Sequence, residues 1–311
     1  MLISLLLLGL VAGAVVPVQT SINTRLSHYT QSAFYASAIS FVVGTLGLVI
    51  LTLIQHPHYL SLHTLSTYTL DYTWFVGGVM GVLFLTGNLL LLPRVGASLT
   101  VVTTIAGQLI MGCFIDTFGY FHVTPQPFTA IKGIGLILLF IGIALMNIQR
   151  RQTLIKQSSQ NIVPWLLLGL VFGFAPPIQA AINSALGQTV GSPVFAALIS
   201  FTIGAVTLLI ITACIHRRFH VLRSHKQYGP LRWWYFIGGL LGVLFVTTTI
   251  ILTAYMGVTY TLIAVMLGQI ITSLVIDHFG LLGITPRTIS KQRIVGLIVI
   301  LLAICLIQFG H

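Results

Sequence analysis

The sequence predicts an all-α integral membrane protein with ten transmembrane helices, arranged as two inverted five-helix repeats. Three observations predict this fold: a shortage of charge, a series of apolar runs and an internal duplication. Of the 311 residues, 57% are hydrophobic and only 5% are charged, whereas soluble domains are about 25% charged. So few charges cannot cover a surface in water, and disordered chains are poor in apolar residues. The composition therefore indicates a chain that lies in a lipid bilayer.

Ten apolar runs lie between short polar segments. A transmembrane helix needs about 20 mostly apolar residues, and no run has the alternating pattern of a barrel strand. Closed helices are the remaining way to satisfy the backbone in lipid. The tightest expected turns are Pro93–Gly96 and Tyr255–Thr259. In chain order, the expected helices are residues 2–21, 34–54, 73–92, 97–115, 131–148, 163–182, 194–215, 234–253, 258–276 and 294–309.

Seven short segments of the first half recur in the second half, 160 or 161 residues later. Each pair falls on corresponding expected helices or on the turns that follow them, so the chain predicts a duplication. A polar stretch between the copies divides the chain into residues 1–150, a cytoplasmic linker at 151–162, and residues 163–311. The matching segments are Pro17–Leu26 and Pro177–Leu186, Ile39–Gly44 and Ile199–Gly204, Gly77/Gly78/Gly81 and Gly238/Gly239/Gly242, Gly107–Gln108 and Gly268–Gln269, Asp116 and Asp277, Phe118–Gly119 and Phe279–Gly280, and Thr124–Pro125 and Thr285–Pro286.

The distribution of Lys and Arg predicts the orientation. Five helices per copy is an odd number, so the second copy must be inverted, an arrangement typical of secondary transporters. Lys and Arg accumulate in cytoplasmic loops, and thirteen of the fourteen fall on one side of the expected topology. Lys132 alone lies on the other side, with both termini. The chain is therefore expected in a bacterial inner membrane with both termini outside the cytoplasm. The net charge of +11 then reflects orientation, with the lipid bilayer as partner and no nucleic acid.

Each half resembles the five-helix YdcZ-type family of the drug/metabolite transporter superfamily. The resemblance rests on G-x-x-x-P-V-Q-x-x-I-N-x-R-L (Gly13–Leu26), on A-x-x-x-S-F-x-x-G (Ala36–Gly44 and again at Ala196–Gly204), and on the G-Q and D-x-F-G motifs of both copies. The second copy departs from the pattern at Ala185, which stands where Arg25 does. The resemblance implies a ten-helix transporter fold and export of small molecules. Better-known relatives have cytoplasmic termini, whereas the charges here predict the opposite.

Four polar residues near the middle of the expected helices are the candidates for substrate contact. Gln108 and Gln269 occupy equivalent positions, Thr104 lies one turn before Gln108 on the same face, and Asn88 could reach the same cavity. Transporters bind substrates near the midplane at the repeat interface. The alternative is that these amides only hold neighbouring helices together.

A second set consists of candidate gates and helix breaks. Pro17 and Pro177 each remove a backbone donor, so a local helix break is expected. The amides that follow lie toward opposite ends of their helices, which suits gates at opposite mouths. The alternative for the two asparagines is that they end the helices. The GG-x-x-G glycines are expected to allow close helix packing. The gating amides are Gln19, Asn23, Gln179 and Asn183.

Asp116 and Asp277 are the only carboxylates that the duplication repeats. Proton coupling normally requires an ionisable group within the membrane, but both stand at helix ends, where a capping or turn role is the alternative. With no acid at the midplane, neutral or zwitterionic substrates are favoured. His216 and His220 share a basic loop without a nearby Cys or carboxylate, so no metal site is expected. No nucleotide-binding or catalytic motif occurs, which predicts neither a cofactor nor an enzyme.

The sequence thus predicts a secondary transporter, an exporter of small metabolites or drugs that works by alternating access as a monomer or homodimer. The alternative is a membrane scaffold or assembly subunit that transports nothing. That alternative predicts a dry interior lined by Leu and Ile.

Overall fold

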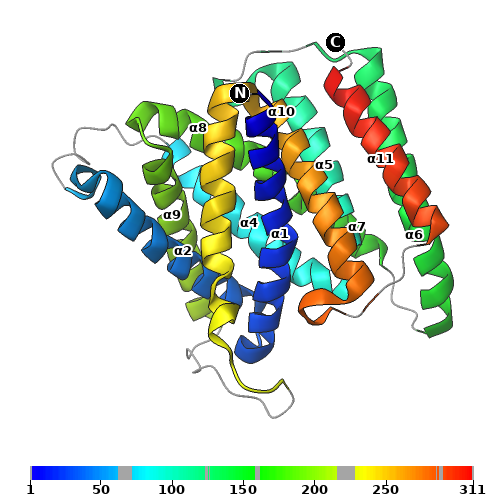
Figure 1. The fold of residues 1–311 in the computed structure, drawn as a ribbon, viewed down its shortest axis with the longest axis horizontal. Coiled ribbons are helices and arrows are strands. Elements are labelled where there is room, and N and C mark those ends of the chain that lie inside the picture. Colours follow the sequence, from blue (N-terminus) through cyan, green and yellow to red (C-terminus); the bar gives the residue numbers. More distant parts are fainter. Residues whose placement is uncertain are drawn as a thin grey trace.

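The computed structural model describes residues 2–61, 72–122, 125, 127–157, 162–215, 228–284, 286 and 290–309. Within these ranges every regular element is a helix. Four short 3₁₀ turns, η1 to η4, join longer helices (Figure 1). The long elements are α1 (Leu2–Thr30), α2 (Ala33–Gln55), α4 (Thr73–Val95), α5 (Ala97–Phe118), α6 (Ala130–Gln157), α7 (Val163–Phe172), α8 (Ala175–Val190), α9 (Pro193–Ile215), α10 (Gly238–Phe279) and α11 (Lys291–Phe309).

Eight helical segments of the described chain are long and apolar enough to cross a membrane. They contain eight of the ten expected spans. The other two expected spans lie on α6 and α11, where the apolar stretches Ala130–Gly142 and Ile294–Ile307 are shorter. Large apolar side chains such as Ile137 and Leu302 are more than half exposed on these helices, as expected of a surface that faces lipid. The chain is a multi-pass helical membrane protein.

Two glycines turn the chain sharply between consecutive helices. Gly96 separates α4 from α5 with φ 79° and ψ 169°, and Gly257, inside α10, has φ 79° and ψ 168°. This backbone region is open essentially to glycine alone. Each of the expected turns at Pro93–Gly96 and Tyr255–Thr259 therefore consists of one non-helical glycine. α10 contains two expected spans, which meet at Gly257.

The expected helix break occurs in one copy only. α1 runs unbroken through Pro17 from Leu2 to Thr30, so the prediction of a break there is wrong. The Ser21 hydroxyl donates a hydrogen bond to the carbonyl of Pro17 at 2.7 Å. In the second copy, Pro176 and Pro177 are adjacent, and neither has the amide hydrogen that a continuous helix needs. There the helix is divided into α7 and α8.

α6 also extends further than expected. Its last residue is Gln157, so residues 151–157 of the expected linker are helical and continue the final helix of the first copy. The polar sequence was read as a break because it ends the apolar run, but polar residues can extend a helix beyond the apolar stretch.

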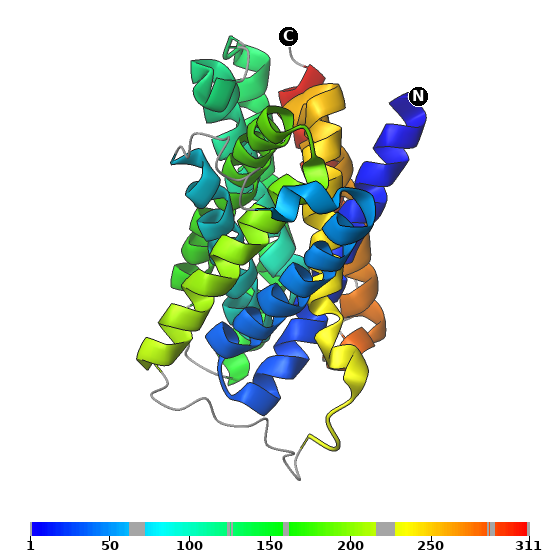
Figure 2. The same cartoon turned by 90° about the vertical axis from the view of Figure 1, so that its left-hand side faces the viewer.

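Corresponding helices of the two copies pack against each other. α2 crosses α9 on one side of the bundle, and α6 pairs with α11 at the opposite edge (Figures 1 and 2). Gly135 lies against Ala303 and Ile307, whereas Gly142 lies against Gly296 and Ile300. The contacts on α11 move to lower residue numbers as α6 proceeds to higher ones. The two helices therefore run antiparallel.

Contacts between the copies are reciprocal. Gly44 of α2 lies against the Phe201 ring of α9, and Gly204 of α9 lies against the Phe41 ring of α2. In each case the ring occupies the space that a Cβ atom would need. The ring centroids of Phe41 and Phe201 are 5.0 Å apart. The two halves therefore present equivalent surfaces to each other.

Candidate functional site

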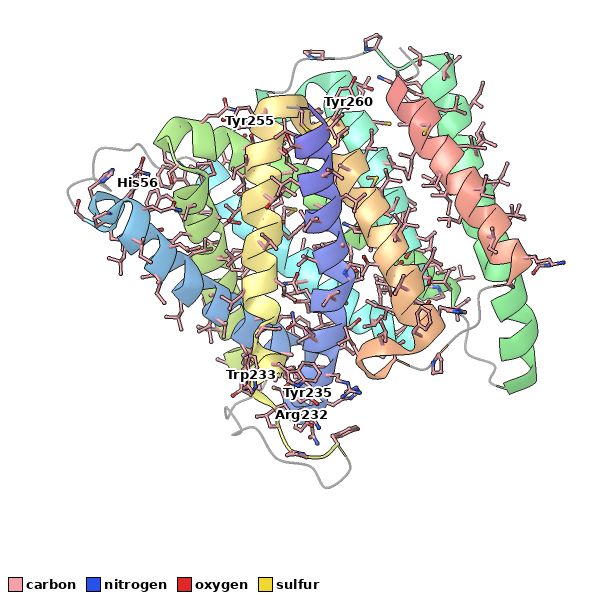
Figure 3. The ribbon with its side chains drawn as sticks, viewed as in Figure 1. His56, Arg232, Trp233, Tyr235, Tyr255 and Tyr260 are labelled. Carbon is pink, nitrogen blue, oxygen red and sulfur yellow. The ribbon has the colours of Figure 1, made fainter. Side chains whose placement is uncertain are left out.

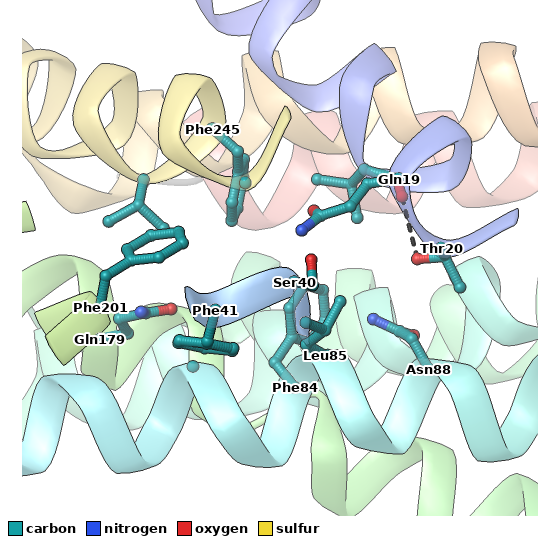
Figure 4. Close-up of a pocket in the computed structure, with 14 residues that line it drawn as sticks. Gln19, Thr20, Ser40, Phe41, Phe84, Leu85, Asn88, Gln179, Phe201 and Phe245 are labelled. Carbon is teal, nitrogen blue, oxygen red and sulfur yellow. Dashed lines mark hydrogen bonds between the residues drawn. The ribbon is translucent and has the colours of Figure 1, made fainter. Parts of the chain in front are cut away.

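A pocket of about 420 Å³ lies where the two copies meet, among α1, α2, α4, α8, α9 and α10 (Figure 4). α1 contributes a short polar segment, and α4 contributes one helical face. The remaining wall comes from α2 and from the second copy. Its lining residues are Val16, Gln19, Thr20, Ser40, Phe41, Gly81, Phe84, Leu85, Asn88, Gln179, Phe201, Gly242, Phe245 and Val246.

Ten of these residues form five pairs of equivalent positions in the duplicated sequence. An offset of 160 or 161 residues relates the members of each pair. A pocket lined in this way surrounds the place where the repeats face each other, which is where transporters built from repeats hold their substrates. The pairs are Gln19 and Gln179, Phe41 and Phe201, Gly81 and Gly242, Phe84 and Phe245, and Leu85 and Val246.

A second pocket of about 280 Å³ adjoins the first on one side. The two share Val16, Thr20, Phe84 and Asn88 as lining residues. The second pocket continues between α1, α4, α5 and α10. Its other lining residues are Pro17, Leu92, Ala97, Thr100, Val101, Thr104 and Gln269.

The structure brings three of the four expected substrate contacts together. Gln269, Thr104 and Asn88 all line the second pocket. Gln108 lines neither pocket and is completely buried. Among the residues that the structure describes, neither the Nε2 nor the Oε1 atom of either glutamine has a hydrogen-bond partner. These amides therefore do not hold neighbouring helices together in this conformation.

The candidate gating glutamines lie at the centre of the protein. Gln19 and Gln179 line the same pocket, so the expectation of gates at opposite mouths is wrong for this pair. The reason is that α1 continues past Gln19 to Thr30, and α8 continues past Gln179 to Val190. Both side chains were placed near helix ends because the apolar runs end there, but the helices do not.

Each of the two asparagines donates a hydrogen bond within its own copy and places its Oδ1 against a glycine of the other copy. The Asn23 amide donates to the Ser40 hydroxyl at 3.0 Å, and the equivalent Asn183 amide donates to Ser200 at 3.2 Å. Both lie inside helices, so neither ends one, and that expectation is wrong. Asn183 Oδ1 lies against Gly77, a contact that leaves no room for a Cβ atom.

The glycines of the GG-x-x-G motifs contact amide side chains as well as the backbones of neighbouring helices. Asn23 Oδ1 lies against Gly238 just as Asn183 lies against Gly77. One turn further along, the Gln19 amide lies against Gly242 and the Gln179 amide against Gly81. Pro177 is buried in α8 and lines neither pocket. The gating set and the glycine motifs thus form one interface between the copies.

Asp277 lies at an interface between the copies. Its carboxylate accepts the backbone N–H groups of Ala97 at 3.2 Å and Ser98 at 3.0 Å, together with the Ser98 hydroxyl. These residues begin α5, so the carboxylate stands at the positive end of a helix dipole. Asp116 occupies the equivalent place in the first copy and is buried.

Over the part of the chain that the structure describes, no group of three His, Cys, Asp or Glu residues could hold a metal ion. His216 and His220 lie outside the described residues. The pockets offer amides, hydroxyls and aromatic rings, which bind solutes through hydrogen bonds and apolar contact.

Comparison with known proteins identifies the family. A family model described as "Putative inner membrane exporter, YdcZ" matches residues 4–145 and again residues 164–306. The chain belongs to the YdcZ family. The resemblance predicted from the motifs is thereby confirmed, and the chain is a multi-pass protein of an inner-membrane exporter family.

A solved structure, described only as a crystal structure of a protein, resembles this YdcZ chain in fold. Its TM-score is 0.58, and the match covers 97% of this chain and 96% of the other at 12% identity. At that identity the likeness concerns the fold alone. No curated protein matches the sequence significantly.

The aromatic lining of the YdcZ pocket was missed at the sequence level. Phe84 and Phe245 close the segment G-V-L-F, which occurs at residues 81–84 and 242–245. The matching GG-x-x-G motifs were noted, but the phenylalanine one turn later was not. Extending the repeat by three residues would have found it.

Proposed function

We propose that this chain is a secondary exporter that holds its substrate in the central pocket. The observation that carries the proposal is the pocket's lining by equivalent residues of both copies, such as Gln19 and Gln179. A site at a repeat interface can be exposed to either side by rocking one half against the other. The family of inner-membrane exporters to which the chain belongs supports the same direction of transport.

We further propose ten membrane-crossing helices in two inverted repeats. The antiparallel pairing of α6 with α11 supports this arrangement, because these are the final helices of the two copies. Their apolar stretches are shorter than the other spans, but each helix as a whole has at least 19 residues, near the length of about 20 that a bilayer requires.

Both termini are proposed to lie outside the cytoplasm. Arg232 lies at one end of the bundle, and the N- and C-termini lie at the other (Figures 1 and 3). Because Lys and Arg accumulate on the cytoplasmic side, the end with Arg232 would face the cytoplasm.

The difference between the two pockets supports alternating access. Gln269 lines the second pocket, whereas the equivalent Gln108 is completely buried and lines neither pocket. A rocking motion that exchanges these environments would close the pocket at Gln269 and open one at Gln108. The reciprocal glycine contacts give each half an equivalent surface on which to move.

The two repeated carboxylates are the candidates for coupling transport to protons. Proton coupling would fall to Asp116 or Asp277, and the Asp277 carboxylate already accepts three hydrogen bonds at the start of α5. The alternative of a scaffold predicts a dry interior lined by Leu and Ile, and the amide and hydroxyl groups among the lining residues of both pockets speak against it.

Flux through liposomes tests the proposal. Liposomes that contain the purified protein would be loaded with a mixture of small metabolites, and their efflux followed by mass spectrometry. Gln19→Ala and Gln179→Ala should each reduce the flux of a transported compound about tenfold, because an unpaired polar group costs about 1–3 kcal/mol. Ser21→Ala, on the same buried segment but outside both pockets, should leave it unchanged. Efflux no faster than from empty liposomes would favour the scaffold.

A further inference from the structure

Aromatic side chains provide much of the wall of the larger pocket. The ring centroids of Phe41 and Phe201 are 5.0 Å apart, and those of Phe84 and Phe245 are 6.4 Å apart (Figure 4). All four residues line the pocket. Aromatic rings pack well against other rings through their faces and edges. The larger pocket therefore suits the apolar ring of a solute.

The smaller pocket contains hydrogen-bonding groups that the protein itself does not use. Gln269 is 1% exposed, and both polar atoms of its amide lack partners. The Thr100 and Thr104 hydroxyls donate to backbone carbonyls one turn earlier, at 2.8 and 2.9 Å. Since each hydroxyl has one hydrogen, these threonines offer only acceptor oxygens to a solute. Gln269 can both donate and accept.

Neither pocket carries a charged side chain. None of the residues that line them is Asp, Glu, Lys, Arg or His. An ion that entered would lose its hydration without gaining a counter-charge. Asp277 lies two turns beyond Gln269 on α10, but its carboxylate is engaged with Ala97 and Ser98. The site therefore disfavours both anions and cations.

We propose that the two pockets together bind an uncharged solute with an apolar ring and a carboxamide-type end. The ring lies among the four phenylalanines, and the carboxamide pairs with the Gln269 amide through one donated and one accepted hydrogen bond. The shared lining residues Thr20 and Asn88 join the two pockets. This assignment rests on the proposed function, because it names the substrate class of the same site.

A series of simple probes tests the class of solute. Equilibrium dialysis would measure the binding of benzamide, benzoate, benzylammonium and acetamide to the full chain in lipid nanodiscs. Benzamide should bind saturably, and the two ions and the ringless acetamide should each bind at least about tenfold more weakly. Absence of benzamide binding, or equal binding of either ion, overturns the proposal. Because dialysis measures no flux, benzamide binding without efflux would leave this assignment standing and count against the exporter.

Two variants with matched controls test the polar end. Gln269→Leu should weaken benzamide binding about tenfold, whereas Ser273→Ala, one turn further along α10 and outside both pockets, should not. Asn88→Asp adds a carboxylate of nearly the same shape to both pockets, so benzylammonium should bind at least about tenfold more tightly. Thr86→Asp, equally buried on α4 but outside the pockets, should give no such gain. A thermal unfolding scan would check that each variant folds, and a loss of benzamide binding in Ser273→Ala as large as that in Gln269→Leu would overturn the assignment.

Discussion

The Asp277 carboxylate accepts the backbone N–H of Ser98 at 3.0 Å, so an acid of the second copy caps a helix of the first. Ala97 donates a second N–H to the same carboxylate at 3.2 Å. A charged acceptor at the first turn of a helix satisfies donors that have no partner within the helix. Asp277, one of the three acidic residues in the chain, therefore links the two halves.

Asp277→Asn should lower the stability of the protein. The amide keeps the size of the side chain but loses the negative charge, and hydrogen bonds to charged groups contribute about 1.5–3 kcal/mol. We expect a lower melting temperature in detergent, measured by the unfolding of the purified protein. Ser98→Ala retains the carboxylate and both backbone bonds, so its loss should be smaller. Equal melting temperatures for Asp277→Asn and the unaltered protein would contradict the capping role.

Gly77→Ala should be destabilising because the added methyl group meets the Asn183 side chain. Overpacking of this kind costs about 1–3 kcal/mol. Shortening the partner in the double variant Gly77→Ala/Asn183→Ala should recover part of the loss, which a double-mutant cycle would measure. Gly112→Ala is the control, since the added Cβ atom would lie 3.4 Å from Leu262 Cδ1, which is an ordinary contact distance. Additive losses in the cycle would show that the two residues do not interact.

Much of the fold could be predicted from the sequence because bilayer thickness dictates apolar length. Eight expected spans correspond to long apolar helices. Helix ends were predicted less well, since polar residues such as Asn23 sit inside a helix when another helix covers them. The apolar run ends near residue 21, but α1 ends at Thr30.

The candidate site could be predicted only in part. Gln269, Thr104 and Asn88 were found because polar residues in apolar helices are conspicuous. Gln108 and Gln269 occupy equivalent positions in the repeat, yet of the two only Gln269 lines one of the described pockets. Equivalent positions in the sequence do not fix equivalent surroundings, because the helices around Gln108 and around Gln269 pack differently in this structure. Phe84 and Phe245 were missed because an aromatic residue among Leu and Val carries no polar signal, whereas Phe41 and Phe201 recur in the S-F-x-x-G motif without indicating a pocket.

Arg25 should stabilise one end of the bundle in a way that the other end lacks. Its Nε donates to the carbonyl of Leu282 at 2.8 Å, and its Nη1 lies 3.4 Å from the Tyr235 hydroxyl. Ala185 stands at the equivalent position. In Arg25→Ala, backbone amides at residues 281–284 should exchange hydrogen faster, as measured by mass spectrometry, while those at residues 120–122 should not change.

Arg94→Ala provides the control for this exchange experiment. The Arg94 guanidinium lies over the Trp165 ring at 4.0 Å, and its Nη1 donates to the carbonyl of Leu90 at 2.6 Å. Its loss should leave exchange at residues 281–284 as it is in the unaltered protein. If both variants accelerate exchange there equally, the effect arises from the loss of positive charge and not from the Arg25 hydrogen bond.

The proposed orientation can be measured with single cysteines. Pro230 lies beside Arg232, whereas Tyr255 lies at the end of the bundle that holds the termini (Figure 3). Both residues are exposed. In a chain whose Cys113, Cys214 and Cys305 are replaced by Ala, Tyr255→Cys should react with a membrane-impermeant maleimide on intact cells. Pro230→Cys should react only after the membrane is permeabilised.

The physical reason for this expected labelling is that Lys and Arg are retained on the cytoplasmic side during insertion. The reverse labelling pattern would place both termini in the cytoplasm, and it would mean that thirteen of fourteen basic residues face outward against that rule.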